Sequence, residues 1–317
     1  MKTKMQFEQA WDLIQSSDRI FLTMHEGPDG DDLGSVLAMR LFLLQLKKQV
    51  WVAIRGEMPE KFKFLSGWEA VSQEVGDLNF DLAIFFGCNR IERTGLKRLE
   101  SLQCQTINFD HHPDNIAFAS VNVVEPSTSS VAELVYYFLK FTSAEITKDI
   151  ATCLLTGIFY DTGGFKHANT TSECLEASAE LLKKGARIDK IAVQLMGKKP
   201  PSTIRAYAKG LENTRFDPEK KMVFSVLTEE DLKEAGASDD DLEGFVELLN
   251  NIPQAKFALL LRQDAGEVKG SLRSEPHKGV DVSKLAQSLG GGGHKLASGF
   301  KIKGRLIRKG NAWQIDI

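Results

Sequence analysis

The sequence predicts an α/β protein with two domains, an N-terminal domain built on a parallel sheet with helices on both faces and a smaller C-terminal α+β domain. Short apolar runs in the first half alternate with longer, helix-like apolar stretches, which favours a parallel sheet. The composition shifts after Gly185, and the second half has strands of its own. The length of 317 residues is also typical of two domains.

The first domain is expected to span residues 1–185. Its predicted elements are a helix over 5–16, a strand at Ile20–Met24, a helix over 33–47, strands at Val50–Ile54, Asp81–Phe86 and 105–109, a helix beginning near Ser130, and an apolar run over Ala151–Tyr160. Ser130 and Glu133 have the spacing of a capping box.

A cluster of polar residues follows the strand Ile20–Met24. His25, Asp29 and Asp31 lie within seven positions, in a Gly/Pro turn that leads into the helix. Ligands bind at the carboxyl ends of strands in open α/β sheets, and crowded carboxylates repel each other unless a cation neutralises them. The alternative is a polar turn in which Asp31 or Asp32 only caps the helix.

A second cluster, Asp110-His111-His112, follows the strand 105–109, and Asp161 ends the next apolar run. The alternative for the histidines is a hydrogen-bonded turn. If the three segments converge on one rim of the sheet, imidazole and carboxylate groups form a site that favours Mn²⁺, with Mg²⁺, Co²⁺ or Zn²⁺ as alternatives.

The second half is expected to consist of a linker over 186–215 and a domain over 216–317. Its predicted elements are strands at Met222–Leu227, Ala255–Arg262, Val268–Ser274 and Ser298–Ile302, a hairpin turn at 264–266, and helices near 239–250 and 281–289.

A glycine-rich segment, Gly290-Gly291-Gly292-Gly293-His294, follows the last predicted helix. Successive backbone N–H groups in such a segment can bind an anion, and His294 and Arg273 add donors for a phosphate. The predicted substrate-binding residues are Arg273, Gly291, Gly292, Gly293 and His294. The alternative is a helix C-cap at Gly290 followed by a loop.

Composition narrows the class of protein. The net charge of −3 is not that of a protein that grips long duplex nucleic acid by its backbone, although it permits a short anionic ligand. The four cysteines form no C-x-x-C pair, and no apolar stretch is long enough for a membrane span. We therefore expect a cytoplasmic protein that does not associate with membranes.

With these motifs in place, the chain resembles the DHH phosphoesterase family over nearly its full length. The turn around His25, Asp110-His111-His112, the segment Gly157–Phe165 and the glycine segment beside Ser271–Ser274 each resemble a family motif. Length and layout are most similar to the small oligoribonucleases that also act on 3′-phosphoadenosine 5′-phosphate. The resemblance implies an N-terminal DHH domain, a C-terminal DHH-associated domain that binds substrate, an active cleft between them, and a homodimer.

The resemblance also implies two metal ions, usually manganese. By position, His25 and Asp29 would hold one ion, and Asp31, His111 and Asp161 the other. His112 would face the substrate as a catalytic residue, and Asp110 would orient a histidine. Two such ions can activate water for in-line attack on a phosphoester.

One position departs from the family pattern. The family's second motif places an aspartate after the third strand, as a ligand shared by both ions, and this chain has Gly87 there. We therefore expect the first ion to be bound weakly, and a Gly87→Asp variant to gain rate.

The predicted function is metal-dependent hydrolysis of short single-stranded oligonucleotides or phosphorylated adenosine nucleotides, weakened by Gly87. A non-hydrolysing nucleotide or oligonucleotide binder is the first alternative, and a linear or cyclic dinucleotide phosphodiesterase is the second.

Overall fold

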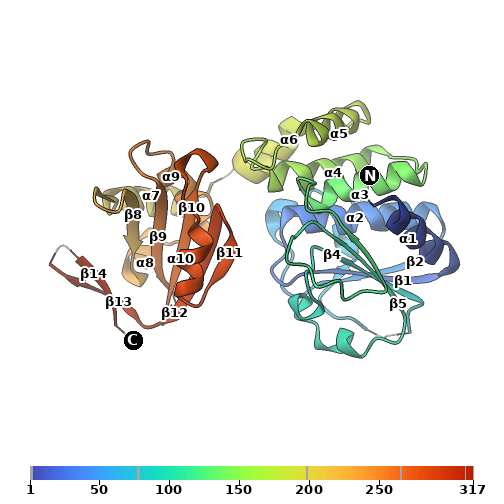
Figure 1. The fold of residues 1–317 in the computed structure, drawn as a ribbon, viewed down its shortest axis with the longest axis horizontal. Helices are drawn as coiled ribbons and strands as arrows, with labels where there is room; N and C mark the ends of the chain where they lie inside the picture. Colours follow the sequence, from blue (N-terminus) through green and yellow to red (C-terminus); the bar gives the residue numbers. More distant parts are fainter. Residues whose placement is uncertain (1–2, 77–78, 198, 265, 311, 317) are drawn as a thin grey trace. The chain divides into compact units, whose positions relative to one another are not determined.

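The computed structural model describes residues 3–76, 79–197, 199–264, 266–310 and 312–316. The chain divides into two compact units, Met1–Gly197 and Lys198–Ile317, which are described separately (Figure 1). No helix among the described residues is both long and apolar enough to cross a bilayer.

A parallel six-stranded sheet forms the centre of the first unit, in the order β3-β2-β1-β4-β5-β6. Its strands are β1 (Arg19–Met24), β2 (Gln49–Ala53), β3 (Val71–Ser72), β4 (Leu82–Phe86), β5 (Gln105–Asp110) and β6 (Val121–Val124). The sequence analysis predicted β1, β2, β4 and β5 to within one or two residues at each end. The short strands β3 and β6 were not predicted.

Helices cover both faces of this sheet, as predicted from the sequence. The first-unit helices are α1 (Lys4–Ser16), α2 (Gly30–Gln45), α3 (Val131–Phe141), α4 (Lys148–Asp161), α5 (Ser172–Lys183) and α6 (Ile188–Ala192). Figure 1 shows α2, α3 and α4 along one face. The short 3₁₀ helices Ile91–Thr94 and Lys97–Ser101 contribute to the cover of the other face.

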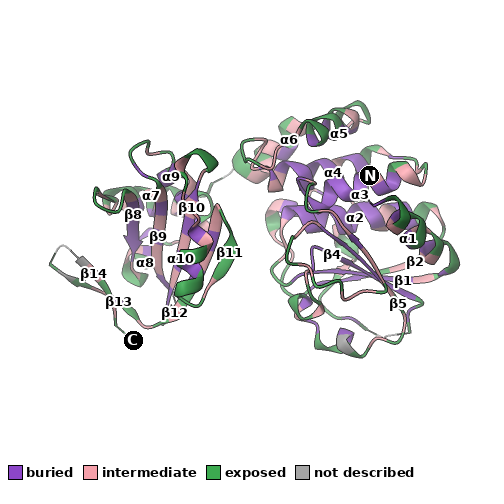
Figure 2. Cartoon of the chain, viewed as in Figure 1, coloured by how far each residue is buried: buried purple, intermediate pink, exposed green. Residues whose placement is uncertain are grey.

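Side chains of the central strands alternate between two apolar cores, because successive residues of a strand point to opposite faces. Ile20 and Leu22 of β1 belong to the core beneath the α-helices, whereas Phe21 belongs to the core on the other face. The strands are therefore buried on both sides, as Figure 2 shows.

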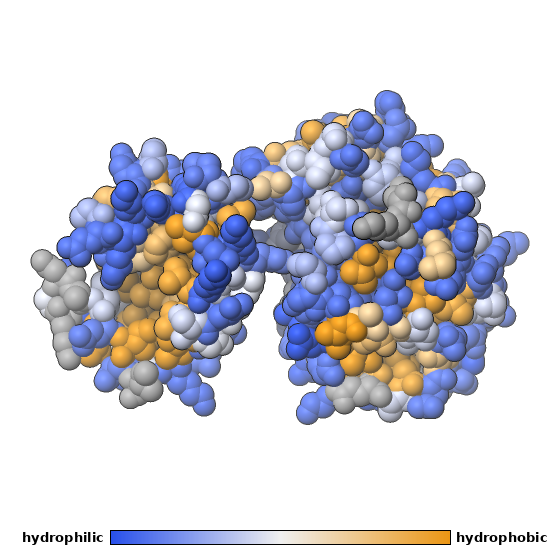
Figure 3. Space-filling view, viewed as in Figure 1, coloured by the Kyte–Doolittle hydropathy of each residue, from blue (hydrophilic) through white to orange (hydrophobic). Residues whose placement is uncertain are grey.

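The second unit contains a mixed six-stranded sheet, in the order β11-β12-β10-β9-β8-β7. Its strands are β7 (Arg215–Asp217), β8 (Met222–Leu227), β9 (Phe257–Asp264), β10 (Glu267–Ser274), β11 (Gly292–His294) and β12 (Ala297–Lys303), followed by a separate hairpin of β13 (Arg305–Lys309) and β14 (Ala312–Asp316). Its helices are α7 (Pro201–Glu212), α8 (Glu229–Ala235), α9 (Phe245–Asn250) and α10 (Val282–Ser288). Figure 3 shows an apolar area on the visible face of this unit.

Two sequence predictions concern the connections. The segment 186–215, predicted as a linker, contains α6, the π-helix Val193–Gly197 and α7. The predicted hairpin turn at 264–266 includes residue 265, which lies outside the described residues, although β9 and β10 pair antiparallel on either side of it.

Candidate metal centre

The carboxyl ends of β1, β4 and β5 meet where the strand order of the first sheet reverses. β2 lies on one side of β1 and β4 on the other, and this is the position at which ligands bind in open α/β sheets. His25 follows β1, Gly87 follows β4, and Asp110 is the last residue of β5.

His25, Asp29 and Asp32 form the first group of candidate metal ligands. One ligand atom from each lies within 4.8 Å of the others. Asp29 caps α2, because its Oδ1 accepts hydrogen bonds from the backbone N–H groups of Asp31 and Asp32, both at 3.0 Å. His25 Nε2 lies 3.4 Å from Asp29 Oδ2 and 2.8 Å from Asp32 Oδ2.

Asp31, His111 and Asp161 form the second group, again with ligand atoms within 4.8 Å of one another. Asp31 belongs to α2, and its carboxylate reaches the N-terminus of α3. There its two oxygens accept hydrogen bonds from the N–H groups of Val131 (2.7 Å) and Ala132 (2.8 Å). His111 Nε2 is 3.7 Å from Asp161 Oδ2. The sequence analysis assigned these three residues to one ion, and the structure brings them together.

Asp161 reaches this group from a helix. It is the last residue of α4, so it joins the residues that follow the strands from the end of a helix and not from a strand of its own. α4 approaches α2 closely, because a Cβ atom on Gly34 would overlap the carbonyl oxygen of Cys153 and one on Gly30 would overlap the side chain of Tyr160. This close packing brings the end of α4 to the start of α2.

His112 and Asp110 form a pair beside the second group. Asp110 Oδ1 lies 2.6 Å from His112 Nδ1 and also accepts the backbone N–H of His111 at 2.8 Å. Burial disfavours the charged imidazolium, but the hydrogen bond and charge of Asp110 outweigh it and raise the pKa of His112. The pair therefore holds a histidine of fixed orientation that can carry a proton.

Electrostatic crowding shifts the pKa values of the acidic groups. Burial, then the negative charges of Asp29 and Asp32, raises the pKa of Asp161 to about 7. Burial and neighbouring carboxylates also raise the pKa of Asp31 and of Asp32. Burial opposes protonation of His25, but hydrogen bonds to Asp29 and Asp32 raise its pKa to about 11. The metal-free site therefore favours bound protons, which a divalent cation would replace.

Asp32 is the residue of this centre that the sequence analysis did not assign to a metal. The sequence left Asp31 and Asp32 as alternatives for the helix cap, whereas Asp29 holds that position. The family pattern left His25 and Asp29 for the first ion, and the structure places the carboxylate of Asp32 beside these two residues. Cys88 is buried in the core on the other face of the sheet and does not belong to either group.

The predicted substrate-binding residues lie in the second unit. Gly292, Gly293 and His294 form β11, which pairs with β12, so the glycine segment is partly a strand and not an open loop. A Cβ atom on Gly291 would overlap the carbonyl oxygen of Gly299, which gives this glycine a packing role. Arg273 Nε donates a hydrogen bond to Glu247 Oε1 of α9 at 2.6 Å.

A basic cavity of about 550 Å³ adjoins the glycine segment in the same unit. Gly290 and Gly291 line it together with Arg262, Lys269 and Lys301. The carboxylate of Asp239 also lines it and forms ion pairs with Arg262 and Lys269, so the three cations outnumber one acid. Arg262 also donates a hydrogen bond to Ser271 Oγ at 2.7 Å, which fixes the guanidinium. The sequence analysis missed these cations, because they are scattered among strand residues and only the sheet register brings them together.

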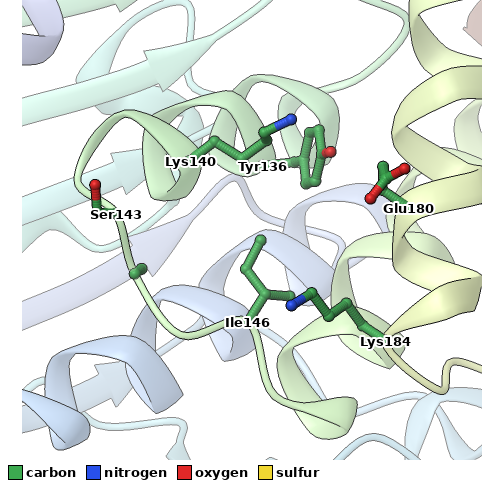
Figure 4. A pocket seen from close by; sticks show the side chains of 7 residues that line it. Tyr136, Lys140, Ser143, Ile146, Glu180 and Lys184 are labelled. Carbon is green, nitrogen blue, oxygen red and sulfur yellow. The ribbon is translucent and has the colours of Figure 1, made fainter.

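The first unit has a cavity of about 300 Å³ between α3 and α5. Tyr136, Lys140, Glu180 and Lys184 line it, as Figure 4 shows. None of the predicted site residues lines this cavity.

Comparison with known proteins identifies the family. Residues 19–158 match the N-terminal domain of the DHH family, and residues 219–312 match the DHHA1 domain. The bifunctional oligoribonuclease and PAP phosphatase NrnA of Thermus thermophilus is 34% identical to the chain, over 90% of this chain and 84% of that protein. The chain belongs to the DHH family. This confirms the family predicted from the sequence motifs.

Other DHH relatives agree with this result. The Bacillus subtilis protein of the same name is 25% identical over 91% of both chains. An exopolyphosphatase-related protein from Bacteroides fragilis is 27% identical and superimposes with a TM-score of 0.89, over 95% of this chain and 92% of that one. Exonuclease RecJ bound to manganese, at 15% identity and a TM-score of 0.52, shares the fold. The predicted fold class is thereby confirmed, and the relatives named as oligoribonucleases and phosphatases are hydrolases of phosphoester bonds, as predicted for this chain.

Proposed function

We propose that this DHH protein is a metal-dependent phosphoesterase that hydrolyses short single-stranded oligonucleotides and phosphorylated adenosine nucleotides. The observation that carries the proposal is the pair of ligand groups around His25 and His111, each with carboxylate and imidazole donors within 4.8 Å. This donor set suits a hard divalent cation such as Mn²⁺ or Mg²⁺. The relatives named as oligoribonuclease and PAP phosphatase support the substrate class.

The proposed ligands are His25 and Asp29 for one ion, and Asp31, His111 and Asp161 for the other. Bound ions would neutralise phosphate oxygens and make water a stronger nucleophile. The N-terminus of α3 orients Asp31 by donating two backbone hydrogen bonds to its carboxylate. Asn169 Nδ2 donates to the carbonyl oxygen of Ser129 at 2.8 Å and lies 3.4 Å from Asp161 Oδ2, which orients that carboxylate.

His112 is the proposed proton donor to the departing oxygen of the phosphoester. Asp110 fixes the ring through Nδ1 and favours the protonated form. A general acid with a fixed orientation contributes ~10²–10⁴-fold to the rate of such reactions. The Asp110 carboxylate does not have to touch the substrate for this, so Asp110 is a positioning residue.

The second unit is proposed to bind the substrate's phosphate groups. Arg262, Lys269 and Lys301 line its cavity next to Gly291 together with one carboxylate, Asp239, which leaves the lining with a net positive charge. Guanidinium and ammonium groups are the usual protein donors to phosphate. Arg273 and His294 stay predicted substrate contacts, and assembly as a homodimer stays a prediction.

The experiment is a hydrolysis assay with di- to pentanucleotides, 3′-phosphoadenosine 5′-phosphate, and linear and cyclic dinucleotides, with Mn²⁺ or with a chelator. Metal-dependent turnover that Asp161→Ala abolishes supports the proposal. Tight binding of these ligands without turnover at any metal contradicts it and supports the non-hydrolysing alternative.

The dinucleotide arms of this assay test a second candidate function. The cyclic-di-AMP phosphodiesterase PdeA of Listeria monocytogenes is 26% identical to the chain, which covers 46% of that longer protein. Preference for a cyclic dinucleotide over short RNA would favour this candidate.

A further inference from the structure

The carboxylate of Asp32 occupies the space that a side chain at position 87 would need. Gly87 follows β4, and a Cβ atom built on it would overlap Cγ and both carboxylate oxygens of Asp32. Asp32 comes from the first turn of α2, a different element. An aspartate at position 87, as in the family pattern, and Asp32 on α2 could therefore not both keep these positions, because their side chains would occupy the same space.

The backbone alone does not explain a glycine at position 87. Its φ of +61° lies in the left-handed region, which favours glycine, but aspartate is among the residues that adopt it most readily. The steric conflict with Asp32 is the stronger reason. Gly87 and Asp32 are thus a matched pair, in which the glycine makes room for the carboxylate.

The surroundings of the Asp32 carboxylate favour a bound cation. Asp32 is only 3% exposed, and its Oδ2 atom lies 2.8 Å from Nε2 of His25. Oδ1 is buried and has no hydrogen-bond partner among the described residues. A buried, unpartnered carboxylate oxygen is unfavourable, and coordination to a metal removes this penalty.

We propose that Asp32 is the third protein ligand of the first metal ion and replaces, from α2, the family's carboxylate at position 87. This inference rests on the proposed function, which supplies the metal ions. The centre then keeps its full number of carboxylates, and the first ion has His25, Asp29 and Asp32 as ligands. The first ion is held as firmly as in a site with the usual aspartate, and Gly87→Asp alone weakens it.

Metal content gives the direct test. The purified full-length protein is equilibrated with Mn²⁺, and the bound ions per chain and their dissociation constants are measured. The unchanged protein is expected to bind two ions. Asp32→Ala and the isosteric Asp32→Asn are expected to lose one ion or to bind it at least about tenfold more weakly. Asp12→Ala, which removes an exposed carboxylate of α1, is the matched control and should bind two ions.

Position 87 provides a reciprocal test. Gly87→Asp in the presence of Asp32 should lower metal affinity, because the two carboxylates collide. Combining Asp32→Ala with Gly87→Asp should restore the second ion, since the usual position then becomes available. Circular dichroism and the melting temperature of each metal-free variant establish that it is folded.

The outcomes separate the inference from the function on which it rests. Two tightly bound ions in Asp32→Ala, or a gain of metal affinity in Gly87→Asp alone, would overturn the role of Asp32 and leave a metal-dependent enzyme. An unchanged protein that binds no divalent cation under any of these conditions would instead overturn the proposed function. Restored binding in the double variant supports the inference independently of activity.

Discussion

His112 and Asp110 allow a sharp prediction at the level of single residues. We expect His112→Ala to lower kcat by ~10²–10⁴-fold, because the departing oxygen loses its proton donor. Asp110→Asn should lower kcat by about 10–100-fold, because the ring loses its orienting carboxylate. Steady-state kinetics on a dinucleotide would measure both effects.

The pH dependence of kcat distinguishes positioning from a loss of folding. Asp110 raises the pKa of His112, so Asp110→Asn should move the alkaline limb of the profile to lower pH. His277→Ala, whose side chain is 73% exposed in the second unit, is the control and should retain full activity. An unchanged alkaline limb in Asp110→Asn would argue against His112 as the acid.

The residues around α2 show how far sequence reasoning reaches. His25, Asp29 and Asp31 were predicted to lie in one site from their spacing, and the structure places His25 and Asp29 in one ligand group and Asp31 in the other, with His111 and Asp161. The sequence could not show which of three neighbouring aspartates caps the helix. Consecutive helical residues point ~100° apart, so Asp31 and Asp32 face different groups once Asp29 is the cap. The missing acid at position 87 was the signal that another carboxylate was needed.

At the level of elements, the contact between α2 and α4 positions the metal ligands. α2 carries Asp29, Asp31 and Asp32 at its start, and α4 carries Asp161 at its end. Gly34 lies between them, and a Cβ atom there would overlap the carbonyl oxygen of Cys153. Gly34→Ala is therefore expected to push the helices apart, destabilise the protein by ~1–3 kcal/mol and weaken metal binding.

Denaturant unfolding and metal titration test the prediction for Gly34. Gly197→Ala is the matched control, because its added Cβ atom would meet Val193 only at an ordinary contact distance of 3.7 Å. That variant should unfold and bind metal like the unchanged protein. Equal stability of Gly34→Ala and Gly197→Ala would show that α2 and α4 can accommodate a methyl group at position 34 without separating.

Element prediction succeeded where burial produces a clear pattern. The central strands are apolar on both faces, and Met222–Leu227 was predicted with its exact bounds for the same reason. The three-residue strand β11 was missed because its glycines carry no hydrophobic pattern, and pairing with β12 defines it. The hairpin of β13 and β14 is likewise defined by pairing between its strands.

At the scale of the whole molecule, the two kinds of chemistry lie in separate units. The carboxylate and imidazole groups belong to Met1–Gly197, and the basic cavity belongs to Lys198–Ile317. The overall charge of −3 hides this division, because acidic and basic residues nearly balance along the chain. Composition therefore argues against long duplex nucleic acid as a partner, which stays a prediction, and it could not locate the cationic lining around Arg262 and Lys269.

Stability without metal is expected to fall as pH rises from 6.5 to 9. The pKa of His25 is raised to about 11, so this group stabilises the folded protein most below its ordinary pKa of 6.5 and loses that contribution progressively as pH rises. The pKa of Asp161 is raised to about 7, so its contribution is lost between its ordinary pKa of 3.8 and about 7, and only the end of that loss falls above pH 6.5. Both effects have the same sign, so the melting temperature should fall by several degrees, given about 2–4 °C per kcal/mol.

Tryptophan fluorescence can follow this transition, because Trp11, Trp51 and Trp68 all lie in the first unit. Saturating Mn²⁺ should abolish the decline, since metal binds the deprotonated groups and releases their protons. The metal contribution to stability should accordingly grow with pH over the same range. A melting temperature of the metal-free protein that rises from pH 6.5 to 9 would contradict this prediction. It would mean that bound protons do not neutralise the carboxylates of the site when metal is absent.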